Sequence, residues 1–381
     1  MKEAFIWCYP WDLEEEGLDS SLARISGELG LDAISVAATH GDIAELRSRY
    51  IAPNHSFVTT SGVAFQPDAG RYSGSRIRPH AAPWLKSRNP LARIAEAAER
   101  HRLALRLNMV CNDMPAIVQR HPHAACVNVF GNASGRWMCP SNPDAREFLA
   151  ALVEDLSANY PARTIELEAF AFSPRRLVDY HASRQPDDDT ARALMSWCFC
   201  AACRQRARDA GIDADALVAN IRERIIRQTE APAAPTTSFD AYLAEQPQVA
   251  AFIRLRAETI ASLVETLRTR ARKRLILHHS PMAQREGIEP SLLDSHCDGW
   301  ITTPPSTVSR AQLTGIDMGR REAAFFCWPP MCKDGPALVS AVHEASQAGC
   351  LAVGFAHYGA APLASLEWIR QAVRYARREA Y

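Results

Sequence analysis

The chain has 381 residues, of which 47% are hydrophobic and 23% are charged, so it has ample material for a large buried core. Its 43 basic and 43 acidic residues cancel, which argues against a nucleic-acid groove or an anionic membrane surface as a partner. No signal peptide and no apolar stretch of about 18 residues occurs, so neither export nor a membrane-spanning helix is expected.

Short apolar runs alternate with amphipathic stretches along the whole chain. This alternation predicts parallel strands that are connected by helices. Eight runs of strand length occur, at residues 4–9, 33–37, 103–110, 164–170, 274–278, 299–302, 323–328 and 351–355. Helical patterns lie between them, at residues 18–29, 91–101, 144–159, 249–272, 336–348 and 363–378.

Eight strand units with a closing helix predict an α/β fold, a single (β/α)8 TIM barrel domain over residues 1–381. An open doubly wound sheet is the alternative, but no Gly-rich loop follows the first run, where a nucleotide-binding sheet needs one. Residues 173–247 are mostly helical and irregular, which predicts an insertion beside the barrel. Its Ala/Pro/Thr stretch at 231–237 is predicted to be a loop within this domain.

The strongest local motif is a cysteine cluster, Cys198, Cys200 and Cys203, in C-x-C-x-x-C spacing. Three thiols at this spacing can converge on one tetrahedral ion, and Cys139, just before the fourth strand, is the best candidate for the fourth ligand. Thiolates favour zinc, and a closed four-sulfur site is structural. An iron–sulfur cluster and a set of thiols without metal are the alternatives. Eleven cysteines without an export signal also favour a reducing, cytoplasmic compartment.

The loop at residues 197–203 resembles the zinc-binding loop of family 42 β-galactosidases. The segments 139–143 and 165–168 resemble bacterial glycoside-hydrolase-like, α-amylase-like TIM barrels, and the segments 9–12 and 354–359 fit the same group. This resemblance implies a carbohydrate-active hydrolase with Glu168 in the acid/base position after strand four. Residues 326–330, after strand seven, contain no carboxylate, so the resemblance supplies no nucleophile.

Two glutamates on the fourth run are candidate catalytic groups, because barrel active sites lie at the carboxyl ends of the strands. Glu166 and Glu168 are two residues apart and share the strand face that points into the barrel. Glu166 is either catalytic or a buried ion-pair partner of Arg106. Glu168 is nearer the mouth and is the favoured general acid/base, which we expect to be desolvated there.

Glycoside hydrolysis commonly uses two carboxyl groups that flank the scissile bond. Asp12, after the first run, is the predicted second carboxylate, across the mouth from Glu168 with a water between them. The alternative role for Asp12 is the N-cap of the acidic turn that follows it.

Other strand-end side chains are predicted to contact the substrate, because sugar rings stack on aromatic faces and hydroxyl groups need polar partners. These side chains are Trp11, His40, Asn108, His278, Trp328, His357 and Tyr358.

The sequence therefore predicts a glycoside hydrolase that acts on a carbohydrate or glycoconjugate, small or oligomeric. A carbohydrate-binding barrel without catalysis is one alternative. A metal-dependent hydrolase or isomerase that uses the strand-end histidines is the other. Whether the chain forms a homo-oligomer is left open.

Overall fold

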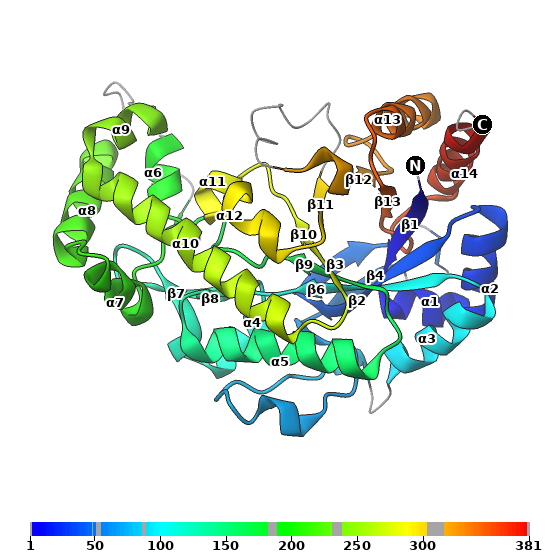
Figure 1. Ribbon diagram of the computed structural model, residues 1–381, viewed down its shortest axis with the longest axis horizontal. Helices are drawn as coiled ribbons and strands as arrows, with labels where there is room; N and C mark the ends of the chain where they lie inside the picture. Colours follow the sequence, from blue (N-terminus) through cyan, green and yellow to red (C-terminus); the bar gives the residue numbers. More distant parts are fainter. Residues whose placement is uncertain are drawn as a thin grey trace.

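Eight parallel strands close into a barrel in the computed structural model, which describes residues 2–47, 49–50, 55–85, 89–181, 189–230, 238–302 and 316–378 (Figure 1). Each strand pairs with its neighbours in chain order, and the last strand returns to pair with the first. The predicted barrel is confirmed, and every predicted run overlaps one of its strands. The strands are β1 Glu3–Cys8, β2 Ala33–His40, β6 Ala104–Val110, β9 Thr164–Glu168, β10 Arg274–His278, β11 Gly299–Thr302, β12 Arg321–Phe326 and β13 Ala352–Ala356.

Helices surround the barrel, and several begin at an Asn or Asp followed closely by proline. The Asn142 side chain accepts hydrogen bonds from the backbone N–H groups of Asp144 and Ala145, which caps α5. Proline at the first helical position costs no hydrogen bond there. The helices are α1 Pro10–Glu16, α2 Leu18–Ala23, α3 Pro90–Arg100, α4 Pro115–Arg120, α5 Pro143–Asn159, α6 Asp189–Leu194, α7 Ala201–Asp209, α8 Ala214–Glu230, α9 Phe239–Glu245, α10 Pro247–Arg270, α11 Ala283–Glu286, α12 Pro290–Leu293, α13 Gly335–Gln347 and α14 Leu363–Arg378.

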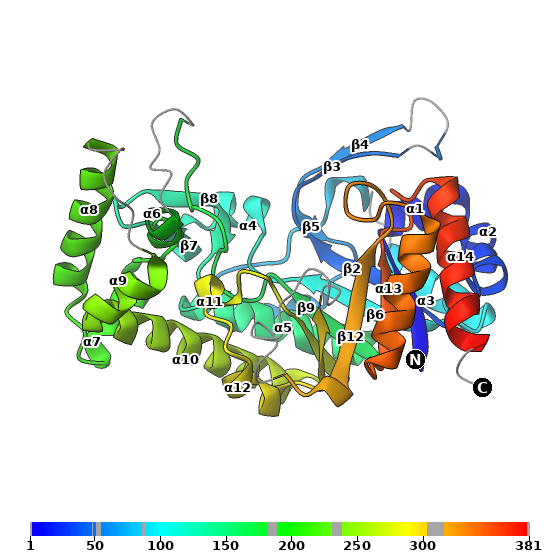
Figure 2. The ribbon, with the colours of Figure 1, turned by 90° about the horizontal axis from the view of Figure 1, so that it is seen from above.

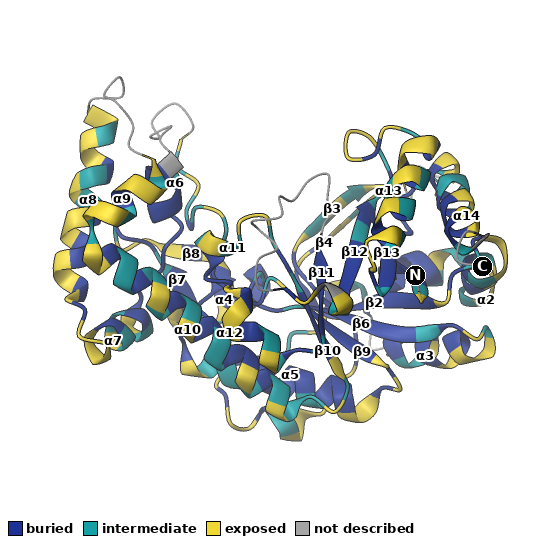
Figure 3. Cartoon of the chain, turned by 45° about the horizontal axis from the view of Figure 1, so that its top comes forward, coloured by how far each residue is buried: buried dark blue, intermediate teal, exposed yellow. Residues whose placement is uncertain are grey.

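The barrel strands are buried, and the surrounding helices bury the faces that they turn toward them (Figure 3). Phe5, Trp7, Ile276 and Ile301 fill part of the barrel interior. Gly354 on β13 lies against this filling, because a Cβ atom there would stand 2.5 Å from the ring of Phe5 and 2.6 Å from that of Trp7. The interior is therefore a packed core and not a channel.

Two β-hairpins stand outside the barrel, and the sequence analysis did not predict them. Figure 2 shows β3 and β4 projecting beyond the barrel strands. The strand β5 adds two residues to the edge of β2 in antiparallel pairing. The bounds are β3 Ile43–Leu46, β4 Ser56–Thr59, β5 Gly62–Val63, β7 Ala125–Val127 and β8 Ala133–Met138.

Helices α6 to α9 lie on the opposite side of the molecule from α13 and α14 (Figure 1). They share a second hydrophobic cluster with the first part of α10, in which Trp197 and Phe199 pack on Phe252. These helices fall within or next to the predicted insertion at 173–247, whose stretch 231–237 lies outside the described residues. The division into one barrel domain with an insertion stays a prediction. None of the described helices is both long and apolar enough to cross a membrane.

Candidate active site and cysteine cluster

Two cavities open at the carboxyl ends of the barrel strands. The larger has a volume of about 440 Å³ and is lined by the segments after β9 and β10 and by β8. The smaller, of about 170 Å³, lies at the ends of β1, β2 and β6. Both are lined by Asp113, Arg136, Glu168 and Ala169. Glu168 therefore stands where the two cavities meet.

Glu168 is the last residue of β9, and its side chain is exposed at this junction. The Asn108 side-chain amide donates a hydrogen bond to Glu168 Oε2 at 3.2 Å. The structure thus places Glu168 at the predicted mouth. The expectation that it would be desolvated is wrong, because the side chain reaches open space.

Glu166 lies one layer deeper and is fully buried. Arg106 Nε donates to Glu166 Oε1 at 2.6 Å, and Trp7 Nε1 donates to Glu166 Oε2 at 2.8 Å. Burial alone would raise the pKa of Glu166, but Arg106, and then hydrogen bonds from His278 and Trp7, lower it to about 2. The ion-pair interpretation is confirmed, and Glu166 lines neither cavity. It lies beneath the cavities and contacts Trp7 and His278, two side chains that line them.

His278 connects this buried pair to the larger cavity, which it lines. Its Nε2 lies 3.4 Å from Glu166 Oε2. Burial alone would lower the pKa of His278, but the carboxylates of Glu166 and Glu168 raise it above its ordinary value. These carboxylates thus favour the positively charged form of His278 at the wall of the larger cavity.

Three of the predicted substrate contacts, His40, Asn108 and His357, line the smaller cavity. The ring of His357 stacks on Tyr9 with centroids 4.8 Å apart. His357 Nδ1 and Ser35 Oγ are buried and have no hydrogen-bond partner among the described residues. Buried polar atoms are rarely left unpaired, and ligand hydroxyl groups in this cavity would satisfy them.

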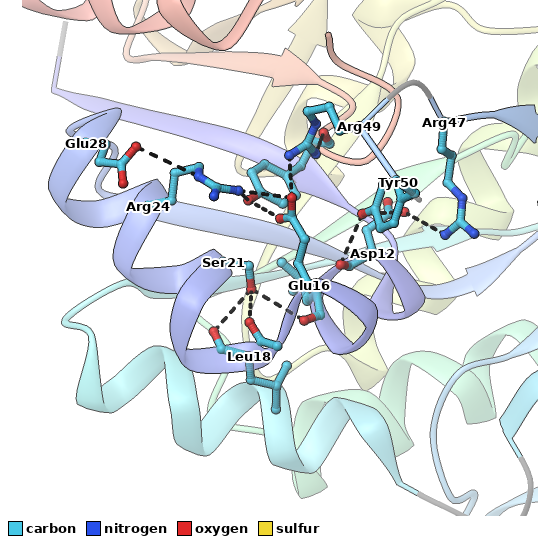
Figure 4. A network of polar contacts seen from close by, with 12 residues as sticks. Asp12, Glu16, Leu18, Ser21, Arg24, Glu28, Arg47, Arg49 and Tyr50 are labelled. Atoms are coloured by element: carbon cyan, nitrogen blue, oxygen red, sulfur yellow. Dashed lines mark hydrogen bonds and ion pairs between the residues drawn. The ribbon is translucent and has the colours of Figure 1, made fainter. Parts of the chain in front are cut away.

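Asp12 does not lie where the sequence analysis placed it. The chain turns into α1 directly after β1, so Asp12 becomes the third residue of that helix and is fully buried. Arg47 Nη1 is 3.7 Å from its carboxylate, and the Tyr50 hydroxyl donates to its backbone oxygen at 3.2 Å (Figure 4). Burial raises the pKa of Asp12. Asp12 lines neither cavity, and the N-cap of α1 is Tyr9, so neither role predicted for Asp12 matches its position.

Trp11, Trp328 and Tyr358 line neither cavity, contrary to the prediction. Trp11 is buried between Tyr9 and Phe57, with ring centroids at 4.4 and 4.6 Å. The Tyr358 hydroxyl accepts a hydrogen bond from Arg24 at 3.1 Å. Trp328 packs edge-on against Phe326. Residues just past a strand can turn either toward the mouth or behind it, and a linear pattern does not distinguish the two.

Several charged residues of the larger cavity were given no role from the sequence, among them Asp113, Arg136 and Glu286. Asp113 follows β6 and pairs with Arg136 of β8, whose Nη2 donates to it at 2.7 Å. Glu286, the last residue of α11, is 5% exposed and also lines this cavity. Burial raises the pKa of Glu286 to about 7, although Ser280 and Arg256 oppose the shift. No periodic pattern marks Glu286, because α11 has only four residues.

The four predicted cysteine ligands come together. The thiol sulfur atoms of Cys139, Cys198, Cys200 and Cys203 all lie within 4.8 Å of one another and are buried. Cys139 Sγ is 3.4 Å from that of Cys203, 3.5 Å from that of Cys200 and 3.7 Å from that of Cys198. A Zn–S bond of about 2.3 Å sets the sulfur atoms of a tetrahedral site about 3.8 Å apart. The cluster therefore has dimensions that suit a tetrahedral metal ion.

Backbone groups around the cluster also suit bound thiolates. The Val127 N–H points at Cys198 Sγ at 3.3 Å, and the Ser141 N–H points at Cys139 Sγ at 3.4 Å. Such donors stabilise the charge on metal-bound sulfur. A fifth buried thiol, Cys126, lies beside the cluster with its Sγ on the Met138 carbonyl at 3.5 Å, and the sequence analysis did not identify it.

Comparison with known proteins shows the fold. No protein-family model matches the chain, and neither does any curated protein sequence. Among solved structures, α-L-fucosidase isoenzyme 2 from Paenibacillus thiaminolyticus superposes on 100% of this chain and 50% of its own, with a TM-score of 0.58 and 12% identity. The β-galactosidase from the psychrophilic Marinomonas ef1 covers 100% of this chain and 60% of its own, with a TM-score of 0.57 and 11% identity. The catalytic domain of β-amylase from Paenibacillus polymyxa covers 97% of both chains, with a TM-score of 0.55 and 9% identity. The chain thus spans 50% and 60% of the lengths of the first two.

Proposed function

We propose that the protein is a glycoside hydrolase whose active site is the mouth of the barrel around Glu168. The observation that carries this proposal is the exposed Glu168 carboxylate at the junction of two cavities. One cavity on each side of a carboxylate suits a substrate with a glycosidic bond at its centre. The solved structures with this fold named above are a fucosidase, a galactosidase and an amylase, which supports the same class of reaction.

The relative sizes of the cavities favour one sugar ring on one side of Glu168 and a larger group on the other. Sites for drug-sized ligands occupy about 300–1,000 Å³. The larger cavity, at about 440 Å³, falls in that range, and the smaller, at about 170 Å³, falls below it. The unpartnered His357 Nδ1 and Ser35 Oγ are polar groups that a ring with several hydroxyl groups would bind.

The test is hydrolysis of a panel of 4-nitrophenyl glycosides by the wild-type protein and by Glu168→Gln. We expect at least one glycoside to be cleaved, and the substitution to lower kcat/KM by at least about 100-fold. Glu96→Gln is the matched control, because Glu96 is exposed on α3 and lines neither cavity. Full activity of Glu168→Gln would remove Glu168 from the reaction.

A carbohydrate-binding barrel without catalysis is the second candidate, and one observation favours it. The first carboxylate after β12 is Asp334, whose side chain caps α13 by accepting from the Ala337 N–H at 2.9 Å. Asp334 is thus engaged in a structural role. Binding of a monosaccharide by calorimetry, with no cleavage of any glycoside in the panel, would select this candidate.

A metal centre built from the strand-end histidines is not favoured by their positions. His278 lies against Glu166, His357 stacks on Tyr9, and His40 Nδ1 lies 2.8 Å from the Gly41 carbonyl. Within the described part of the chain, the group of three or more metal-binding side chains that converge is the cysteine cluster.

We further propose that the cysteine cluster holds a structural zinc ion. Four thiolates close the coordination shell, so the ion would tie the segment after β8 to the start of α7 and not act on substrate. None of the eleven cysteines forms a disulfide, which fits the reducing cytoplasm that the sequence predicts.

A further inference from the structure

Glu286 is the last residue of α11, the short helix after β10, and lies in the wall of the larger cavity. The neighbouring part of that wall is the segment that follows Glu168 at the end of β9. The backbone oxygen of Glu286 accepts a hydrogen bond from the Phe172 N–H at 3.1 Å, which ties α11 to the segment after β9. Both glutamates line the same cavity. Two carboxyl groups thus face one substrate space from adjacent barrel units.

The surroundings of Glu286 disfavour its charged form. Its side chain is buried, and Oε2 has no hydrogen-bond partner among the described residues. Ser280 is the polar neighbour that most opposes the rise in the pKa of this carboxyl group. Arg256, the cation that opposes the pKa shift, donates to the Arg285 carbonyl, and its guanidinium lies over the Phe172 ring at 4.3 Å. A buried carboxylate without a direct cationic partner costs free energy, which protonation removes.

Asp113 is a half-buried carboxyl group of the same cavity, and Arg136 engages it. Arg136 binds both of its oxygens through Nε and Nη2. Burial raises the pKa of Asp113, but this bidentate guanidinium opposes the shift by stabilising the charged form, which disfavours proton donation by Asp113. Glu286 has no such contact.

We propose that Glu286 is the general acid of the site and the catalytic partner of Glu168, an assignment that rests on the proposed glycosidase activity. The pKa of about 7 that burial gives Glu286 is consistent with a group that is largely protonated below neutral pH. Glu168 is exposed at the same cavity, which His278 also lines, and the assignment gives it the role of the base.

In the step that this assignment implies, the bond between the anomeric carbon and the glycosidic oxygen breaks. Its electron pair stays on the leaving oxygen, which takes the proton of Glu286. A water oxygen bonds to the anomeric carbon, and Glu168 removes the proton that the water loses. Exchange with solvent then returns a proton to Glu286 and takes one from Glu168, so that atoms and charges balance.

The experiment compares two leaving groups on whichever sugar the nitrophenyl panel shows to be cleaved. A 2,4-dinitrophenyl glycoside needs no proton to leave, whereas a methyl glycoside does. We expect Glu286→Gln to cleave the dinitrophenyl glycoside within about threefold of the wild-type rate, and the methyl glycoside at least about 100-fold more slowly. Glu168→Gln should lose both reactions. Glu289→Gln is the control, since Glu289 is exposed and lines neither cavity.

An independent readout is carbon-13 NMR of labelled glutamate carboxyl groups in the wild-type protein and Glu286→Gln. One carboxyl resonance should titrate near neutral pH and be missing from the variant. If Glu286→Gln does not fold, Glu286→Asp tests the same selective loss with a shorter acid.

The assignment of Glu286 would be overturned if Glu286→Gln cleaved both glycosides at the wild-type rate, or if it lost activity on both to the same extent. In either case the loss of activity in Glu168→Gln would still support the proposed glycosidase. A wild-type protein that cleaves no glycoside, or a fully active Glu168→Gln, would overturn the proposed function itself.

Discussion

Arg106 and Glu166 form an ion pair inside the barrel, with Arg106 Nε donating to Glu166 Oε1 at 2.6 Å. The same guanidinium donates to Glu3 Oε1 at 2.7 Å and to Glu322, so one buried cation faces three carboxylates. Its plane also lies over the Phe5 ring at 3.8 Å. Arg106 therefore holds together strands from opposite parts of the barrel.

Replacing Arg106 with methionine should destabilise the fold strongly. The substitution keeps an apolar chain of similar length but leaves buried carboxylates without their cation, which typically costs about 3–5 kcal/mol. Urea unfolding followed by circular dichroism measures the change. Arg93→Met is the control, because the Arg93–Glu14 pair is partly exposed and such pairs contribute about 0–1 kcal/mol. Similar losses of unfolding free energy in the two variants would show that the buried Arg106 contributes no more to stability than a partly exposed ion pair does.

Glu286 should make the fold less stable as the pH rises from about 4.5 to about 7. Its pKa in the folded protein is raised by burial to about 7, while the unfolded chain releases this proton near its ordinary value. Below both values the group is neutral in both states and has no effect. Above the unfolded value only the unfolded chain ionises, which favours unfolding by about 3 kcal/mol once the pH reaches 7.

This pH dependence is measurable as the difference between the wild-type protein and Glu286→Gln in urea unfolding at several pH values. The glutamine variant should lack the decline between pH 4.5 and 7, and Glu289→Gln should keep it. Parallel stability curves for the wild type and Glu286→Gln would contradict a neutral Glu286.

The barrel could be predicted from the sequence because each strand is a short apolar run and each long helix has a local start signal. Asn142 before Pro143 is one such signal, and it caps α5 as expected. The hairpin of β3 and β4 could not be predicted in this way. Its strands are four residues long, and Leu46 and Val58 are exposed by 81% and 73%, so their apolar character gives no sign of a buried strand.

The site was predictable where strand geometry sets the direction of a side chain. Period-two alternation placed Glu166 and Glu168 on one face of β9 and brought Arg106 to meet Glu166. Beyond the strand end this rule stops, so Asp12 on α1 and Glu286 on α11 could not be placed. Their burial depends on segments distant in sequence, such as Arg47 for Asp12 and Phe172 for Glu286.

Cys200→Ser should lower the metal content and the melting temperature together. A serine hydroxyl is a poor zinc ligand, and the loss of a structural ion removes the tie between the segment after β8 and α7. Elemental analysis of the purified protein and thermal unfolding measure the two effects. Cys126→Ser is the matched control, because Cys126 is a buried neighbour that lies outside the group of four. Unchanged zinc in Cys200→Ser, or equal loss in Cys126→Ser, would show that the ligand set is wrong.

Gly354→Ala should destabilise the barrel and weaken the site at the same time. The new methyl group would stand 2.5–2.6 Å from the rings of Phe5 and Trp7, closer than real Cβ contacts, so the rings must move. Overpacking of this kind costs about 1–3 kcal/mol. Because Trp7 donates a hydrogen bond to Glu166 and lines the smaller cavity, its displacement should also reduce activity on any glycoside that the wild type cleaves. Gly135→Ala on β8 is the control, since a Cβ there meets nothing within 4 Å, and a melting temperature lowered equally in both variants would contradict the packing argument.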